Sequence, residues 1–214
     1  IFTLLLGLHL LEASTRTLRT FPCGDQVAQM NRLACLRSTV IGPSHFRESH
    51  KRANRPVMSS NIPHLIFISG PVGVGKTSVA QELSGLLVTR SIAHTFVDLD
   101  ALTYTYPRPS YDPFGQDLAL KNLQAVWANA QDYAPRFLLI ARVIETEAGA
   151  FKIAETVKAG RCTIVQLSAR DETPLERVRQ REIGTGRAWH EARALKLSRS
   201  LSETDFAEHA LNTD

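Results

Sequence analysis

Apolar and polar positions along the chain predict repeated strand–helix units from residue 64 onward. Four apolar stretches have the length and composition of buried strands, at 64–69, 91–97, 136–144 and 162–167. The segments between them carry apolar residues at helical spacing, at 79–87, 117–132 and 147–159. The stretch 136–144 is apolar on both of its alternating faces, which is typical of a parallel strand buried between two layers of helices.

The last third of the chain is expected to add two helices and one strand. Thr173-Pro-Leu-Glu176 has the form of a capping box with proline at the first helical position, which predicts a helix running to about Ile183. The glycines of 184–186 end that helix, and a second helix near 189–201 and a short strand at 205–211 follow. Repeated βα units with short connections predict an α/β fold with three layers, built on an open parallel sheet of about five strands.

The first 57 residues differ from the rest of the chain. Residues 1–11 are apolar, but this stretch is too short to span a bilayer and has no basic leader. Residues 14–56 are rich in Arg, Ser and Thr and show no sustained period. We expect Met58 to lie close to the biological start, with 1–57 a disordered or non-native upstream extension of a domain over 58–214. The alternative is a secretory signal peptide at residues 1–14.

The end of the chain carries an expectation of its own. The sequence Leu211-Asn-Thr-Asp214 resembles the beginning of a final strand, whose continuation and closing helix would then be missing. The expected domain is therefore truncated at its C-terminus.

Net charge and cysteine content exclude some classes of function. Residues 1–57 hold eight Lys/Arg and three acidic residues, whereas residues 58–214 hold seventeen and eighteen, so the overall charge of +4 belongs to the first segment. The expected domain is not basic, which argues against a nucleic-acid partner. The three cysteines show no metal-ligand spacing and indicate no disulfide scaffold. This usage suits the reducing cytoplasm.

The chemistry of the chain is concentrated in one loop. The run Gly70-Pro-Val-Gly-Val-Gly-Lys-Thr77 matches the phosphate-binding pattern G-x-x-x-x-G-K-[ST] between a predicted strand and a predicted helix. Glycines allow the backbone amides to surround an anion, and the start of the helix adds unpaired donors. Lys76 is expected to reach the β- and γ-phosphates, and Thr77 to bind Mg²⁺. The expected nucleotide-binding residues are Gly70, Pro71, Val72, Gly73, Val74, Gly75, Lys76, Thr77 and Ser78. The alternative is a glycine-rich turn with an exposed lysine.

Together with Asp98-Leu-Asp100 and an arginine-bearing helix–loop after the fourth strand, this loop resembles the small P-loop kinases. That group includes shikimate, gluconate, adenylylsulfate and adenylate kinases and chloramphenicol phosphotransferase. The resemblance covers about residues 64–213, and Trp189-His190 also resembles an uncharacterised bacterial ATP-binding group. It implies a P-loop NTPase fold of the nucleotide/shikimate kinase type, ATP and Mg²⁺ as cofactors, a small-molecule acceptor and no membrane partner.

The resemblance also implies roles for two carboxylates. By position, Asp98 is assigned to the Mg²⁺ side, and Asp100 to the acceptor side as general base or orienter. Their alternation at a strand end predicts that they point to opposite faces. The alternative is that Asp100 caps the segment beginning at Ala101. A conventional Walker B carboxylate is absent from the end of the third strand, so either Asp98 or Glu145 substitutes for it, or the metal relies on Thr77 and water.

Three arginines are candidates for contacts with the transferring phosphate. Arg177 and Arg181 share one face of the expected helix, and Arg187 follows the Gly-Thr-Gly hinge. The resemblance implies that such arginines close over the phosphate, so Lys76, Asp100, Arg177, Arg181 and Arg187 form the predicted catalytic set. The alternative is a solvated helix face whose arginines pair with Glu176 or Glu182.

Three further residues are weaker candidates. Arg108 is a candidate anchor for an anionic acceptor, unless it belongs to a surface loop with buried tyrosines. Arg142 and Glu145 are placed to line the cleft.

The sequence therefore predicts a cytoplasmic ATP-dependent phosphotransferase acting on the hydroxyl of a small molecule. The alternative is a P-loop ATPase or nucleotide-dependent switch without a small-molecule acceptor. A kinase acting on nucleic-acid ends is disfavoured by the charge of the domain. The acceptor and the oligomeric state stay open.

Overall fold

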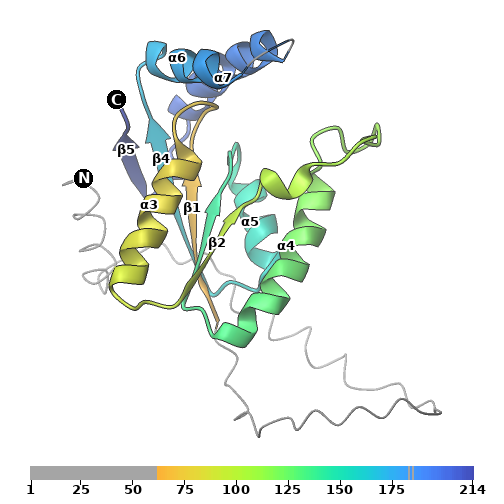
Figure 1. Ribbon diagram of the computed structural model, residues 1–214, viewed down its shortest axis with the longest axis vertical. Helices are drawn as coiled ribbons and strands as arrows, with labels where there is room; N and C mark the ends of the chain where they lie inside the picture. Colours follow the sequence, from red (N-terminus) through yellow and green to blue (C-terminus); the bar gives the residue numbers. More distant parts are fainter. Residues whose placement is uncertain (1–61, 183, 185) are drawn as a thin grey trace, which may run out of the picture.

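The computed structural model describes residues 62–182, 184 and 186–214. The expectations for residues 1–57 and for a start near Met58 lie outside these residues. The described chain forms one parallel sheet with the strand order β2-β3-β1-β4-β5 (Figure 1). The strands are β1 (His64–Ser69), β2 (His94–Asp98), β3 (Phe137–Ala141), β4 (Arg161–Ser168) and β5 (His209–Asn212). This confirms the expected α/β fold with an open parallel sheet of five strands.

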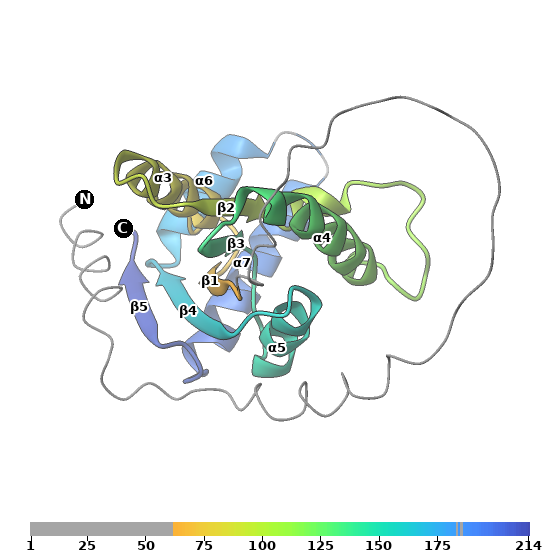
Figure 2. The same cartoon turned by 90° about the horizontal axis from the view of Figure 1, so that it is seen from below.

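Helices follow the strands in the expected alternation. They are α3 (Lys76–Thr89), α4 (Gln116–Ala130), α5 (Glu147–Thr156), α6 (Glu172–Arg181) and α7 (Arg187–Ser202), with short 3₁₀ turns η1 (Ala101–Thr103) and η2 (Gln131–Tyr133). Figure 2 shows α3 on one side of the sheet and α5 on the other. Within the described residues, no helix combines the length and the apolar character needed to cross a membrane.

Two apolar clusters fill the space between the three layers. On one face, Leu83 and Leu87 of α3 pack with Ile66 and Leu139 of the central strands. On the other face, side chains of α4 and α5 pack against the opposite residues of the same strands, and this cluster includes Leu65, Phe67, Leu123, Trp127, Leu138 and Ile153. Every residue of β3 is buried, as its two apolar faces predict. The central strands are therefore held rigidly, and their carboxyl ends form a fixed edge.

The carboxyl edge of the sheet carries all the segments with candidate chemistry. Figure 1 shows α6 and α7 beyond the tips of β1 and β4, next to the loop that leads from β1 into α3. In an open parallel sheet this edge is where ligands bind. The fold thus brings together segments that lie more than 100 residues apart, such as the loop at Val74 and Arg177.

The predicted capping box at Thr173 is wrong. Helix α6 begins at Glu172, after Asp171, and no side chain caps it. The hydroxyl of Thr173 instead donates to Asp214 Oδ1 at 2.8 Å, and the amide of Arg170 donates to the same oxygen at 3.0 Å. A charged carboxylate just beyond β5 thus takes the Thr173 hydroxyl that the box would have used.

Element boundaries also differ from the apolar runs. Strand β2 begins at His94 rather than residue 91, because the chain turns through Ser91 with a φ of 55°. Strand β3 ends at Ala141, β5 covers 209–212 rather than 205–211, and α7 begins at Arg187.

Candidate functional site

The loop between β1 and α3 adopts a conformation that requires glycine at two positions. Gly70, Gly73 and Gly75 have φ values of 145°, 83° and 99°. A Cβ atom at Gly70 would lie 2.7 Å from the carbonyl oxygen of Leu167, and one at Gly73 would lie 2.5 Å from that of Pro174. Side chains are therefore excluded at both positions by backbone that cannot move aside.

The amides at the start of α3 are available for an anion. The first main-chain bond of the helix runs from the Val79 amide to the Gly75 carbonyl at 2.9 Å. Within the described residues, the amides of Gly75, Lys76 and Thr77 donate to no main-chain carbonyl. Unpaired amides and the positive end of the helix dipole together favour a bound phosphate group.

Lys76 lies across this loop. Its Nζ atom donates to the carbonyl of Pro71 at 3.0 Å. Burial lowers the pKa of Lys76 to about 8, and the negative charges of Asp100 and Asp98 counteract part of that change. This half-buried position differs from the exposed lysine of an ordinary glycine-rich turn.

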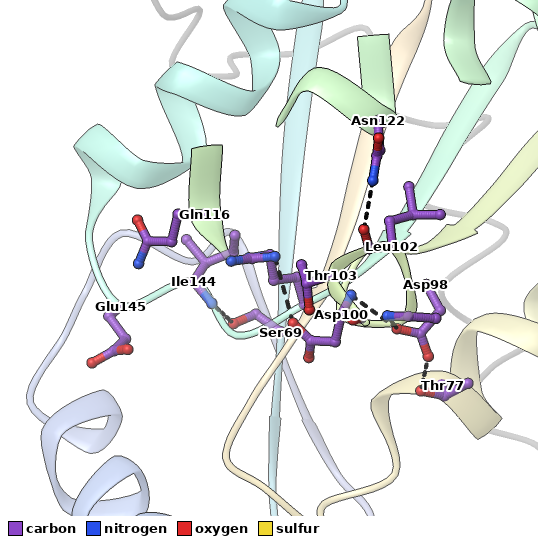
Figure 3. A network of polar contacts seen from close by, with 12 residues as sticks. Ser69, Thr77, Asp98, Asp100, Leu102, Thr103, Gln116, Asn122, Ile144 and Glu145 are labelled. Carbon is purple, nitrogen blue, oxygen red and sulfur yellow. Dashed lines mark hydrogen bonds and ion pairs between the residues drawn. The ribbon is translucent and has the colours of Figure 1, made fainter. Parts of the chain in front are cut away.

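Thr77 and Asp98, the two predicted Mg²⁺ ligands, lie in contact. The hydroxyl of Thr77 donates to Asp98 Oδ2 at 2.7 Å (Figure 3). A hydroxyl and a carboxylate are hard oxygen ligands, which Mg²⁺ prefers. Among the described residues, no group of three or more His, Cys, Asp or Glu side chains offers a metal site. The oxygen atoms of Thr77 and Asp98 fit Mg²⁺, which commonly combines one or two protein ligands with water and substrate phosphates.

The other oxygen of Asp98 caps the turn that follows β2. Asp98 Oδ1 accepts hydrogen bonds from the amides of Asp100 and Ala101, at 3.1 and 3.3 Å (Figure 3). Asp100 precedes η1 but makes no side-chain cap, so the expected alternative for Asp100 is wrong and Asp98 has the capping role. The cap leaves the Asp100 carboxylate available for other contacts.

Asp100 lies beside the loop in a turn rather than on the strand. Its φ and ψ are −69° and −34°, so the strand alternation that placed Asp98 and Asp100 on opposite faces does not apply. Burial among its neighbours raises the pKa of the Asp100 carboxyl, and the positive charges of Arg142 and Lys76 counteract that rise. The side chain is still 59% exposed, so the carboxylate can be reached by a ligand.

Arg177 braces the loop from its outer side. Its guanidinium donates to the carbonyl of Val74 at 3.3 Å and to that of Thr213 at 2.8 Å. The Thr213 hydroxyl donates to the same Val74 carbonyl at 2.9 Å. Arg177 thus lies at the loop, but its donors point to main-chain oxygen, whereas the sequence predicts contact with the transferring phosphate.

Arg181 and Arg187 lie in surface ion pairs. Arg181 pairs with Glu182 at 3.0 Å, which matches the alternative expected from the sequence. Arg187 pairs with Glu191 at 3.2 Å, and Arg179 pairs with the same carboxylate at 3.2 Å. Arg181 lies close enough to Lys76 to contribute to lowering its pKa.

The aromatic loop at residues 104–114 is exposed. Tyr104, Tyr106 and Tyr111 are 88%, 96% and 82% exposed, so the expectation of buried tyrosines is wrong. Arg108 donates to the carbonyls of Thr103 and Pro113 at 3.2 and 3.1 Å, and so holds the shape of its own loop.

Sequence patterns did not reveal three polar residues that shape the far side of the site. The buried Ser69 hydroxyl accepts from the amide of Ile144 at 3.0 Å, and thus ties the end of β1 to the segment after β3 (Figure 3). Arg193 of α7 pairs with Glu145, and its guanidinium lies 5.8 Å from the ring centre of Phe114. Asp112 accepts from three amides at the start of α4, at 2.6 to 3.4 Å. Only Asp112 carried a signal, a short polar side chain five residues before the predicted helix at 117–132.

No family model and no curated protein sequence matches the chain. Solved structures that resemble it include a gluconokinase from Sinorhizobium meliloti, with 17% identity and a TM-score of 0.45 over 72% of this chain and 84% of that chain. A sugar kinase from a Janibacter species has 17% identity and a TM-score of 0.44, over 70% and 83% of the two chains. A chain from the PezAT toxin–antitoxin system of Streptococcus pneumoniae has 19% identity and a TM-score of 0.42, over 59% and 55%. We base the proposed function on the geometry of the site itself.

Proposed function

We propose that this protein is an ATP-dependent phosphotransferase that moves the γ-phosphoryl group of Mg-ATP to a hydroxyl of a small molecule. The supporting observation is the grouping at the start of α3. An open glycine loop, the half-buried Lys76 and the Thr77–Asp98 pair lie together there, and Asp100 lies beside them.

In this proposal the segment 70–78 binds the nucleotide. The loop amides hold the β- and γ-phosphates, and Lys76 leaves the Pro71 carbonyl to reach them. Thr77 and Asp98 hold Mg²⁺, which neutralises charge on the phosphate oxygens when bound. Cytoplasmic location is part of the proposal, because Mg-ATP is the phosphoryl donor.

Asp100 orients the acceptor. The acceptor oxygen attacks the γ-phosphorus, the bond to the bridging oxygen of ADP breaks, and the hydroxyl proton passes to the Asp100 carboxylate. A raised pKa makes Asp100 a better proton acceptor than an ordinary surface carboxylate. Its exposed position beside the loop supports this role.

The arginines divide into two groups. Arg177 acts as a positioning residue, since it holds the Val74 carbonyl on the outer side of the loop. Arg181 and Arg187 would exchange their surface carboxylates for the phosphoryl group once nucleotide is bound. Exposed ion pairs are weak, so this exchange costs little.

The test is transfer of radioactive label from γ-labelled ATP to a panel of hydroxylated metabolites, aminoglycosides and nucleosides, with Mg²⁺ present. Label on an acceptor supports the proposal, and Lys76→Ala abolishes the transfer without unfolding the protein.

ATP turnover that needs no acceptor instead supports the second candidate, a P-loop ATPase or nucleotide-dependent switch. That candidate is favoured by the end of β3, where Ile140 and Ala141 stand and no Walker B carboxylate is found. Undiminished nucleotide affinity in Lys76→Ala would refute the role of the loop.

A further inference from the structure

Arg142 is a buried cation at the edge of the proposed acceptor site. It directly follows β3, and its amide donates to the carbonyl of Ile68 in β1 at 3.2 Å. Its backbone is thus fixed between the two central strands, at the edge that carries the site. Its side chain is only 13% exposed.

The guanidinium of Arg142 is poorly satisfied by the protein. Its buried Nη1 atom has no hydrogen-bond partner in the part of the chain that the structure describes. Within the described residues, the one ion pair of Arg142 joins this same Nη1 atom to Asp100 Oδ1 at 3.5 Å. This distance is longer than that of a good charge-assisted hydrogen bond. A guanidinium offers five N–H donors in a planar fork. Burying such donors without partners is costly, which indicates that a ligand completes the site.

Neighbouring cations at this edge are already engaged. Arg193 is paired with Glu145, and Arg108 donates to two carbonyls of its own loop. Lys76 lies on the Pro71 carbonyl, on the nucleotide side of Asp100. Arg142 differs from them, because its Nη1 atom makes no hydrogen bond within the described residues and its ion pair with Asp100 is long.

We propose that Arg142 binds an oxyanion of the acceptor, a carboxylate or a phosphate, close to the hydroxyl that receives the phosphoryl group. This inference rests on the proposed function and narrows its substrate class to hydroxylated anions. The planar fork of an arginine matches two oxygens of such a group. The 3.5 Å contact puts the Arg142 guanidinium beside the carboxylate that is proposed to orient the hydroxyl.

The charges around Arg142 set the expected behaviour of the site. Asp100 and Asp98 are negative and oppose an incoming anion, whereas Lys76 is positive and favours it. Removing the charge of Asp100 should therefore strengthen anion binding, and removing the charge of Arg142 should abolish most of it. A role for Arg142 limited to holding Asp100 would not produce the second of these effects.

The first experiment uses inorganic phosphate as the probe. The full chain is saturated with Mg²⁺ and a non-hydrolysable ATP analogue, so that the loop is filled, and phosphate is titrated by NMR up to about 50 mM, above the millimolar Kd typical of a small anion. We expect one phosphate to bind, at least about tenfold more weakly in Arg142→Gln, and more tightly in Asp100→Asn. Arg90→Gln, which removes an exposed arginine at the end of α3, is the charge-matched control and should leave binding unchanged.

The second experiment compares matched acceptors. Hydroxy acids, phosphorylated alcohols and their uncharged counterparts are offered with labelled ATP, which separates the carboxylate and phosphate arms. We expect transfer to one anionic class, with a KM that rises about tenfold or more in Arg142→Gln while kcat changes less. Equal use of uncharged acceptors would overturn the inference.

Failure of the inference and failure of the proposed function are distinguishable. Loss of nucleotide binding would refute the phosphotransferase, and the phosphate titration would then be run on the nucleotide-free protein. Phosphate binding that is absent from the wild-type chain, or equal in Arg142→Gln, would overturn the role of Arg142 while leaving the nucleotide site intact.

Discussion

Gly73 shows how one residue controls the shape of the loop between β1 and α3. Its φ of 83° and the backbone oxygen of Pro174, 2.5 Å from the position of a Cβ, act independently against any side chain. Gly85, in the interior of α3, faces open space and has neither constraint. Gly73→Ala and Gly85→Ala therefore form a matched pair of variants, one at a constrained glycine and one at an unconstrained glycine.

Gly73→Ala is expected to destabilise the protein by about 1–3 kcal/mol, because it adds backbone strain and a clash with main-chain atoms. The affinity of the Gly73→Ala variant for nucleotide should also fall. Gly85→Ala should instead stabilise α3 by about 0.5–1 kcal/mol and leave nucleotide affinity unchanged. Urea denaturation and nucleotide titration measure both effects, and equal stability of the two variants would contradict the described loop.

In the proposed nucleotide site, Lys76 is expected to give binding a pH dependence. With a pKa of about 8, the side chain is charged below pH 8 and loses its proton above it. Nucleotide affinity should therefore fall by up to about tenfold per pH unit above pH 8, since the neutral amine does not attract phosphate. Lys76→Arg keeps its charge throughout and should show a flat profile over this range, whatever its absolute affinity. If the wild-type protein binds nucleotide with the same affinity from pH 7 to pH 10, the role of Lys76 is disproved.

The identity of the capping carboxylate could not be predicted from the sequence. The pattern Asp98-Leu-Asp100 shows two carboxylates at a strand end, and the structure brings both to the loop. Which of them caps the turn depends on where β2 stops, and β2 stops where Asp98 pairs with Ala141 in the sheet. Pairing of this kind is a tertiary property that a local pattern does not contain.

Among the elements, α6 and the end of β5 act together on the loop. Arg177 of α6 and Thr213 after β5 both donate to the carbonyl of Val74. That carbonyl is held away from the helix amides, so the amide side of the loop stays open for phosphate. The brace is thus built from three segments that are distant in the chain.

Arg177→Gln should weaken nucleotide binding and leave kcat nearly unchanged at saturating ATP. Loss of one hydrogen bond from a charged donor corresponds to about 1.5–3 kcal/mol. Thr213→Val removes the second donor to Val74 and should show the same pattern with a smaller effect. Steady-state kinetics distinguish this positioning role from contact with the transferring phosphate, which would lower kcat while leaving nucleotide affinity intact.

The cores of the elements were predictable, whereas their ends were not. The apolar runs of β1, β3 and β4 and the helical spacing of α4 and α5 reflect burial, which the sequence encodes directly. The start of α6 depends instead on Asp214, a residue 41 positions away that takes the hydroxyl of Thr173. The expected capping box failed for this reason.

At the scale of the whole molecule, His64 joins the three central strands. It begins β1, its ring lies 5.5 Å from that of Phe137 in β3, and its Nε2 atom lies 2.9 Å from the hydroxyl of Thr163 in β4. Burial, with the positive charges of Arg161 and Arg136, lowers the pKa of His64 to about 4. The folded sheet therefore holds this histidine in its neutral form.

This histidine should make the fold sensitive to acid. An unfolded chain protonates His64 near its usual pKa of 6.5, whereas the folded chain resists until about pH 4, so stability falls as the pH drops from 6.5 to 4. His64→Gln should be less sensitive between pH 7 and pH 5, as judged by the urea midpoint at each pH. Identical pH dependence of the two proteins would refute this assignment.

The strand order could not be predicted from the sequence. The sequence could predict, however, that the segments with candidate chemistry lie on one edge of the sheet. Nothing local specifies that β1 lies between β3 and β4. Parallel strands nevertheless place all their carboxyl ends on one edge, whatever their order. The loop after β1 and the aspartates at the end of β2 were therefore expected on the same edge of the sheet. The largely buried position of the Arg142 side chain depends on packing around β3, which the apolar pattern of the sequence does not predict.

The hydrogen bond from the Ile144 amide to Ser69 has a consequence for how the two substrates communicate. Ser69 immediately precedes Gly70, and Ile144 stands two residues after Arg142, so one buried contact links the donor half of the cleft to the acceptor half. If a bound substrate displaces one of these segments in the proposed enzyme, this hydrogen bond couples the displacement to the other segment. Thermodynamic linkage then requires that the acceptor changes the affinity for nucleotide by the same factor as the nucleotide changes the affinity for the acceptor.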